Sequence, residues 1–387
     1  MTAGGRAGGR TGRRAAAGIV AVVVLAVWPS GRLAAQDSQF GIRGLGTPGR
    51  GESVRARSTG GAFGPFDALS PLLDASLADV RRTTAGITGG TSWRTAEFGG
   101  TETSLRGTRF PALVIAGPVS SRLVVAGGFA TYLDRTFGIT TRDTVVLRGE
   151  PEPVTDEVRS DGGVTDLRLA LAVRVRDHVA IGVGLHRLTG STRVAAVRRF
   201  DDSATYRTST ARDDVAYEGM GGSVSALLDL GPDLRVVAWG RSDTKLRADI
   251  RGRTTAEDDL PMAVGGGVRW RAGAQAVVAA AVAWRSWGGE GDVASGGNDS
   301  ISHDTFDWSV GAELGSVGTT LRFGVRGGRL PFGVDEAPRE FGVAAGLGKL
   351  FSGGRGRIDL GVERLQRTGG GMTEGVWTFL LGLTVRP

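Results

Sequence analysis

The sequence predicts an all-β protein, a transmembrane antiparallel β-barrel of about 14 strands that follows a short, partly helical N-terminal plug. Three observations support this fold class. The first residues have the pattern of an export signal. From about residue 84 onward, hydrophobicity alternates with a period of two. Between the alternating stretches, short connections alternate with long polar ones. Such alternation is typical of strands that present one face to lipid and the other to a polar interior.

Residues 1–35 have the three parts of a secretory signal peptide. An apolar run, Ala15–Trp28, is followed by "LAAQ", which offers a cleavage point after Ala35. Four arginines form the positive region before it: Arg6, Arg10, Arg13 and Arg14. An anchoring helix is the alternative, but at about 1.5 Å per residue the run is too short for a hydrocarbon core of about 30 Å. We therefore expect the mature chain to be exported.

Residues 36–83 differ from the rest of the exported chain. They are rich in Gly and Pro at first and then read "GGAFGPFDALSPLLDASLADVRR". Pro65 and Pro71 interrupt a set of apolar residues that lie close to helical spacing. These are Leu69, Leu72, Leu73, Leu77 and Val80. We expect this segment to fill the barrel lumen as a plug or hatch. A periplasmic tail is the alternative interpretation.

Residues 84–387 contain the alternating stretches that we expect to form the barrel. In "DLRLALAVRVR", Leu167, Leu169 and Leu171 point one way, whereas Asp166 and Arg168 point the other. Many of the stretches are long enough to cross a bilayer at a tilt. The 14 predicted strands lie near residues 84–97, 108–117, 121–134, 165–176, 178–188, 219–230, 233–243, 261–271, 274–287, 304–314, 318–328, 338–350, 354–366 and 373–386.

The connections distinguish a barrel from a soluble sandwich, which also alternates in hydrophobicity. Very short connections lie around residues 177, 231–233, 272–273, 315–318 and 352–354. Long polar connections lie near residues 135–164, 189–218, 244–260 and 288–304. Short turns at one end and long loops at the other are typical of outer-membrane barrels, and an even strand number allows closure.

Aromatic residues near the predicted strand ends favour the same fold, since outer-membrane barrels carry aromatic girdles at both interfaces. The candidates are Trp284, Trp287, Phe341, Phe351, Trp377 and Phe379. For any one of them, a scattered apolar surface residue is the alternative.

Alternation also predicts which charged side chains face the lumen. The candidates are Arg168, Arg174, Arg269, Arg322, Arg326, Asp307, Glu313 and Asp359. Two roles remain open for the arginines. They can pair with the carboxylate of a bound molecule, for which the guanidinium fork is well suited. They can also brace the lumen through salt bridges to acidic residues, which include Asp166 and Glu363.

Several classes of site and partner are not expected. "GLGTPG" at Gly44–Gly49 matches the dinucleotide fingerprint, but no strand precedes it, and Pro48 stands where the phosphate-binding helix would begin. The absence of Cys excludes disulfides and thiolate metal sites, and three His leave little material for an imidazole site. We therefore expect no cofactor and no metal. The net charge of +7 comes from arginines spread among acidic residues, which disfavours nucleic acid as a partner.

An outer-membrane enzyme would need a nucleophile with a histidine, or paired carboxylates, near the rim. His186 lies near a strand end, and His303 stands beside Asp304. Neither belongs to a serine motif that specifies a triad. We therefore expect no catalytic residues and no enzyme.

The order of these parts resembles the FadL/OmpP1/TodX family of outer-membrane transport proteins. Gly60–Phe63 matches a Gly-Gly-Ala-Phe-like element of that family, and Asp74–Ser76 follows it before the first strand. Ser70 and Pro71 stand near the place of the family's Asn-Pro-Ala motif, and the closing hairpin ends in Pro387 rather than an aromatic residue. The resemblance implies a plugged barrel that passes hydrophobic compounds, such as long-chain fatty acids, across the outer membrane.

The expected location is the outer membrane of a Gram-negative-type cell, and the expected partners are outer-membrane lipid and hydrophobic small molecules. A second function remains open, that of a non-transporting barrel that serves as a scaffold in secretion or envelope assembly. Long loops such as "RTSTARDDVAYEG" would then bind an envelope protein.

Overall fold

The computed structural model describes residues 39–42, 44–70, 73–98, 101–287, 301–315, 318–333 and 336–387. The predicted signal peptide, residues 1–35, lies outside them. Residues 35–387 form one compact unit, which contains all of the described ranges. Within the described residues, no helix is both long and apolar enough to cross a membrane.

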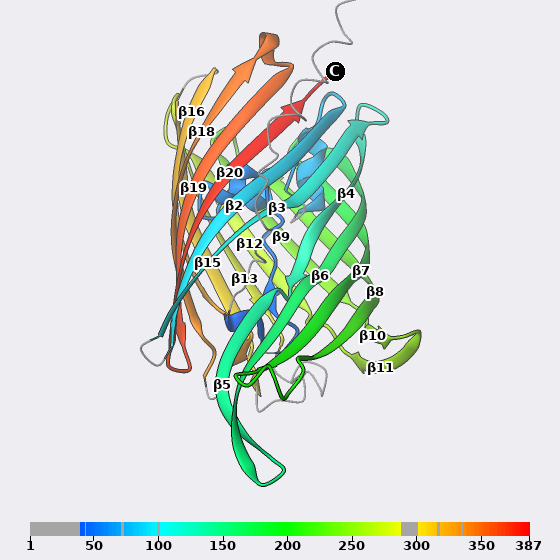
Figure 1. Ribbon diagram of the computed structural model, residues 1–387. Helices are drawn as coiled ribbons and strands as arrows, with labels where there is room; N and C mark the ends of the chain where they lie inside the picture. Colours follow the sequence, from blue (N-terminus) through cyan, green and yellow to red (C-terminus); the bar gives the residue numbers. More distant parts are fainter. Residues whose placement is uncertain are drawn as a thin grey trace, which may run out of the picture. The chain divides into compact units, whose positions relative to one another are not determined.

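In the part of the chain that the structure describes, 14 strands form a closed antiparallel ring (Figure 1). The last of them pairs with the first, which closes the ring. Closure satisfies the backbone groups that lipid cannot. The predicted barrel and its strand number are confirmed. The ring strands are β2 (Thr84–Phe98), β3 (Thr101–Pro118), β4 (Leu123–Asp134), β6 (Glu150–Arg176), β7 (Val179–Phe200), β8 (Ser209–Asp229), β9 (Leu234–Asp243), β12 (Ala263–Arg271), β13 (Ala276–Arg285), β15 (Thr305–Gly315), β16 (Thr319–Arg329), β18 (Arg339–Phe351), β19 (Gly356–Gly369) and β20 (Met372–Val385).

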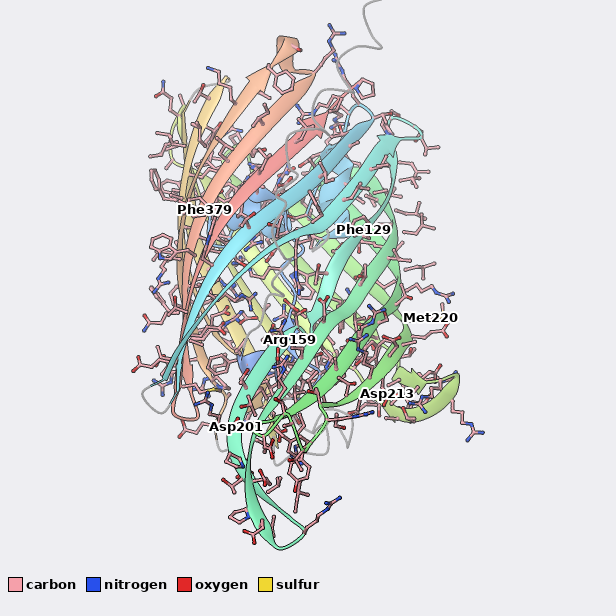
Figure 2. The ribbon with its side chains drawn as sticks, viewed as in Figure 1. Phe129, Arg159, Asp201, Asp213, Met220 and Phe379 are labelled. Atoms are coloured by element: carbon pink, nitrogen blue, oxygen red, sulfur yellow. The ribbon has the colours of Figure 1, made fainter. Side chains whose placement is uncertain are left out.

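The two faces of the ring differ in polarity, as the period of two predicts. On β6, Leu169 is 55% exposed, whereas its neighbour Arg168 is 8% exposed. Figure 2 shows Phe379 and Met220 on the outer surface, and both side chains are more than half exposed. The outer face is thus an apolar belt suited to lipid.

Three of the predicted long loops are strands for most of their length. Residues 137–147 form β5 (Phe137–Leu147), which pairs with the first half of β6 as a hairpin that projects beyond the ring (Figure 1). β7 and β8 extend in the same direction. β10 (Leu246–Ile250) and β11 (Arg253–Asp258) form another hairpin beside β8. The fourth predicted loop lies mostly outside the described residues; β14 (Ile301–Ser302) pairs with β17 (Phe332–Gly333).

Polar sequences form these extensions because cross-strand ion pairs support them. Arg198 binds Asp156 at 2.6 Å, and Arg199 binds Glu157 at 2.9 Å. Hydrogen bonds from Arg198 and Arg199 lower the pKa values of Asp156 and Glu157, respectively. The sequence reads as loop here because charged and polar residues interrupt the apolar alternation of these strands.

A segment inside the ring precedes the first ring strand. We call residues 44–70 and 73–80 the inner segment, which appears as blue turns within the ring in Figure 1. Its elements are short: β1 (Thr47–Pro48), α1 (Val54–Arg57), η2 (Gly64–Phe66) and η3 (Asp74–Asp79), with η1 (Gln39–Ile42) before them. The Ser53 hydroxyl accepts a hydrogen bond from the Ala56 amide at 3.1 Å and so caps α1.

Small residues make room for the inner segment. Phe63, Phe66 and Leu77 are buried against a wall whose buried residues are mostly alanine. The wall residues are Ala116, Val124, Ala126, Ala170, Ala172, Ala180, Leu227, Val237 and Ala279. At Gly324, a Cβ atom would lie 2.0 Å from the carbonyl carbon of Thr59, so only glycine fits there.

The Gly44–Gly49 motif also has a packing role. Gly46 has φ of +96°, and a Cβ atom there would lie 2.3 Å from the Asp134 carbonyl oxygen of β4. β1, which contains Pro48, pairs with the end of β4. The glycines thus let the backbone run against β4, and the first α-helical residue is Val54.

The ring wall is incompletely paired at one place, which we call the seam, between β3 residues 101–110 and β4 residues 131–134. The ladder between β3 and β4 extends from Pro118 only to Ala112, next to Pro111, which has no N–H group. Beyond it β3 pairs with β2, whereas the end of β4 pairs with β1. Figure 1 shows β3 and β4 diverging from this point. Arg109 of β3 binds Asp134 of β4 across the seam at 2.8 Å.

Candidate functional site

Ion pairs attach the inner segment to the β15–β19 side of the ring. Arg55 of α1 donates two hydrogen bonds to Glu313 of β15, at 2.7 and 2.5 Å. The fully buried Arg322 of β16 binds Glu313 at 2.8 Å and Asp359 of β19 at 2.7 Å. Three predicted lumen candidates, Glu313, Arg322 and Asp359, thus lie in one cluster. Arg57 of α1 binds Glu363 of β19 at 2.5 Å, and Arg50 contacts the same carboxylate.

The candidates Arg168 and Arg174 attach the other end of the inner segment. Arg168 donates to Asp74 of η3 at 2.7 Å, and both side chains are buried. Arg174 binds Asp79 of η3 at 2.7 Å. Their observed partners are therefore acidic residues of the inner segment.

The remaining candidates lie apart from one another. Arg326 binds Glu340 of β18 at 2.8 Å, and Asp307 contacts Arg285 of β13. Arg269 has no salt bridge within the described part of the chain; its guanidinium carbon lies 5.9 Å from the centroid of the Phe66 ring. Arg269 lines a cavity of about 450 Å³ at the end of the ring with short turns.

A polar chain joins the inner segment to β6, β7 and β8 through His186. Its Nδ1 lies 2.9 and 3.0 Å from the Asp166 oxygens, and its Nε2 lies 2.8 Å from the Ser223 hydroxyl. The Ser223 hydroxyl donates to Asp74 at 2.6 Å. The chain thus runs from Asp166 through His186 and Ser223 to Asp74 of η3.

The interior at the extension end is apolar. Leu45, Leu133, Leu188, Tyr217 and Trp287 belong to one buried cluster there. Trp287 was expected in the aromatic girdle, and this expectation is wrong. Its ring is 2% exposed and packs edge-on against Phe332 at 5.3 Å, because the β17 segment covers it from inside. Four other girdle candidates are exposed on the outer face: Phe341, Phe351, Trp377 and Phe379.

A cavity of about 140 Å³ adjoins this apolar cluster. Tyr132, Leu133, Trp239 and Trp287 line it together with His186. The charged residues Glu52, Asp166, Arg241, Asp243 and Arg285 line the other side, so the cavity combines aromatic walls with a strongly charged side. Within the described residues, no group of His, Asp and Glu side chains has the arrangement of a metal site.

Sequence reasoning missed the residues of the inner segment that hold it in place. They are Arg50, Arg55, Arg57, Asp74 and Asp79. No strand periodicity applies to them, so their direction could not be inferred. Their charge was the available signal, because basic residues gather in "RGESVRAR" and acidic ones in "DASLAD". Ser223 carried no signal of its own.

The comparisons with known proteins concern the fold. A scan against protein-family models and a search of curated proteins both found no match. Solved structures do match over nearly their full length. The CymD monoaromatic hydrocarbon channel has a TM-score of 0.57 at 14% identity, with 87% of this chain and 98% of that chain covered. A Pseudomonas aeruginosa FadL homologue has a TM-score of 0.59 at 11% identity, covering 88% and 99%.

The Pseudomonas putida toluene transporter TodX has a TM-score of 0.58 at 13% identity, covering 87% of this chain and 99% of that one. The resemblance seen in the sequence is thus confirmed at the level of the fold. The chain has the barrel fold of the FadL and TodX channels.

Proposed function

We propose that this protein is an outer-membrane channel for hydrophobic compounds, with the inner segment as its movable plug. The observation that carries the proposal is the position of the cavities. One of about 450 Å³ lies at the short-turn end and one of about 140 Å³ toward the extension end, and the inner segment lines both. A molecule that passes from one to the other has to displace the inner segment.

The size of the smaller cavity and its aromatic side support a small apolar substrate. An apolar protein cavity of about 150 Å³ is large enough to bind benzene. The cavity of about 140 Å³ next to Trp239 and Trp287 matches that size. The structurally similar CymD and TodX are described as a monoaromatic hydrocarbon channel and a toluene transporter, which agrees with this substrate class. A long-chain fatty acid is a second candidate, whose carboxylate would suit the unbridged Arg269.

The attachment of the inner segment supports its movement. α1 is held to the wall by the charged pairs of Arg55 and Arg57 beside the small buried side chains of Val54 and Ala56. When such pairs separate in a hydrated lumen, water solvates the freed charges and offsets part of the lost attraction. The Asp166–His186–Ser223 chain serves attachment in the same way. We propose no catalytic role for it, since the Ser223 hydroxyl donates its hydrogen bond to Asp74 rather than to His186.

A reversible tether tests the proposal. The Ala75 amide donates to the Ser225 hydroxyl at 2.9 Å, so Ala75→Cys with Ser225→Cys places two thiols together in a chain without other cysteines. The assay uses bacteria that lack their own channel, because apolar solutes cross plain phospholipid vesicles unaided. We expect saturable uptake of labelled toluene or oleate that falls when the disulfide forms and returns with reductant.

Each single cysteine variant is the matched control and should show no response to oxidant. Uptake that is insensitive to the tether would contradict the movable plug. Equal uptake of a small sugar would contradict selectivity for hydrophobic compounds.

One observation favours the scaffold function as a second candidate. The β5–β6 hairpin projects beyond the ring, and within the described residues β5 pairs on one side only. Such an edge can accept a strand from another protein. Normal envelope assembly in a strain that lacks the protein would count against this function.

A further inference from the structure

A small cavity at the seam is lined by more positive than negative charge. It has a volume of about 100 Å³ and lies where the start of the inner segment meets β2, β3, β4, β19 and β20. Five arginines line it, but only two carboxylates, those of Asp134 and Glu363. The arginines are Arg50, Arg57, Arg94, Arg109 and Arg367.

The two carboxylates are shared among four of these arginines. Glu363 contacts both Arg50 and Arg57. Asp134 binds Arg109 at 2.8 Å and lies 3.9 Å from Arg94. Arg367 binds Glu340 and Glu374 behind the cavity wall. Arg50 also lies 3.6 Å from Glu52, which is outside the cavity lining, so the four guanidinium groups that face the cavity contact three carboxylates in all.

Several guanidinium N–H groups at this cavity have no hydrogen-bond partner within the described protein. They are Nε and Nη2 of Arg50, Nε of Arg57, and Nε and Nη1 of Arg94, all of them buried. Arg57 as a whole residue is only 8% exposed. Buried charged donors without an acceptor are costly, so such groups normally have a ligand, an ion or water.

The chemistry of the cavity selects its ligand. Guanidinium groups present paired N–H donors that match carboxylate and phosphate oxygens. A volume of about 100 Å³ holds roughly three waters at about 30 Å³ each, or one small oxyanion. We propose that this cavity is a binding site for an oxyanion group, a phosphate or a carboxylate, held by Arg50, Arg57 and Arg94.

The location at the seam bears on where the oxyanion comes from. Arg109 and Pro111 of β3 line one flank of the cavity, and Thr131 and Asp134 of β4 line the other. The β3–β4 ladder is absent here, so the tail of an amphiphile could lie between the strands while its head group fills the cavity. A free anion would occupy the same donors. The proposal concerns binding to the folded barrel and does not depend on transport.

Calorimetric titration of the purified full-length barrel in a non-ionic detergent tests the site. The probes are inorganic phosphate, dodecyl phosphate and dodecanol. We expect saturable binding of a phosphate-bearing probe that Arg94→Gln weakens by about tenfold or more, the effect of losing one charged hydrogen bond. Arg94→Lys should fall between wild type and Arg94→Gln, because it keeps the charge and loses the fork.

Arg193→Gln is the matched control, since it removes the same charge from an exposed pair with Asp214 on the extensions. Binding of inorganic phosphate would identify a free anion as the ligand, and binding of dodecyl phosphate alone would identify an amphiphile head group. The proposal is overturned if neither phosphate probe binds, if dodecanol binds equally well, or if Arg193→Gln weakens binding as much as Arg94→Gln. Heat-dependent mobility on gels shows whether each variant is folded.

Discussion

Arg322 connects the inward charges into a network. It is completely buried and makes the salt bridges to Glu313 and Asp359, and Glu313 in turn holds Arg55. A buried pair adds little net stability compared with an apolar replacement, but removal of one partner leaves an unpaired charge in the interior. A buried charged residue therefore affects stability mainly through the partner charges that its removal leaves with fewer contacts.

Arg322→Gln should lower the free energy of unfolding by about 1.5–3 kcal/mol, the usual contribution of a charged hydrogen bond, because Glu313 keeps Arg55 and Asp359 keeps Arg357. Urea unfolding in detergent measures this quantity. Arg187→Gln is the control, because its pair with Glu218 is exposed and should contribute only about 0.2–1 kcal/mol. Equal effects of the two substitutions would show that the buried pairs of Arg322 contribute no more stability than an exposed pair.

The elements divide into those that build the ring and those that extend beyond it. The outer half of the β5–β6 hairpin pairs within itself, whereas residues 154–174 and 176 of β6 pair with β7. The hairpin therefore contributes an exposed surface and few contacts to the barrel. An element of this kind can be shortened without loss of the ring.

Removal of residues 144–153, with Asp143 joined to Val154 through an Asn-Gly turn, should leave barrel stability and hydrophobic uptake unchanged. Asp143 and Val154 are paired partners, and a type I′ turn suits the twist of such a hairpin. Gel mobility after heating and the uptake assay measure the two properties. Loss of uptake by a folded variant would place part of the substrate path in this hairpin.

The whole molecule has a polar, occupied interior and an apolar exterior. The outward residues of β6 illustrate this, since Leu167, Leu169 and Leu171 are all more than 40% exposed. Water would not tolerate such a continuous apolar face, whereas lipid does. The arrangement assigns the outer face to the membrane and the inner face to the inner segment.

Leu169→Arg should reduce the free energy of folding into lipid vesicles by about 2–4 kcal/mol, the cost of arginine on the lipid face near the bilayer centre. Val146→Arg is the matched control, since Val146 is 71% exposed on the β5–β6 hairpin. This control should change the same free energy by less than about 0.5 kcal/mol. A small effect of Leu169→Arg in vesicles would contradict the lipid-facing assignment.

The sequence by itself determined the ring. Its period of two assigned Leu169 outward and Arg168 inward, and the short turns fixed the strand number, because local alternation encodes the face of each residue. The same reasoning failed for the extensions, where residues such as Arg198 and Asp156 interrupt the apolar alternation of the strands. It also failed for Trp287, whose position depends on the β17 segment that covers it.

Only the tertiary structure showed which charged side chains form salt bridges with one another. Arg168 and Asp74 are 94 residues apart in sequence, and Arg55 and Glu313 are 258 apart. The period of two predicts that Arg168 faces inward. It does not predict which residue of another segment Arg168 contacts. Those partners come from the inner segment, whose short turns follow no strand period. The contacts between the inner segment and the wall therefore arise from closure of the ring around a stretch of chain that local patterns do not orient.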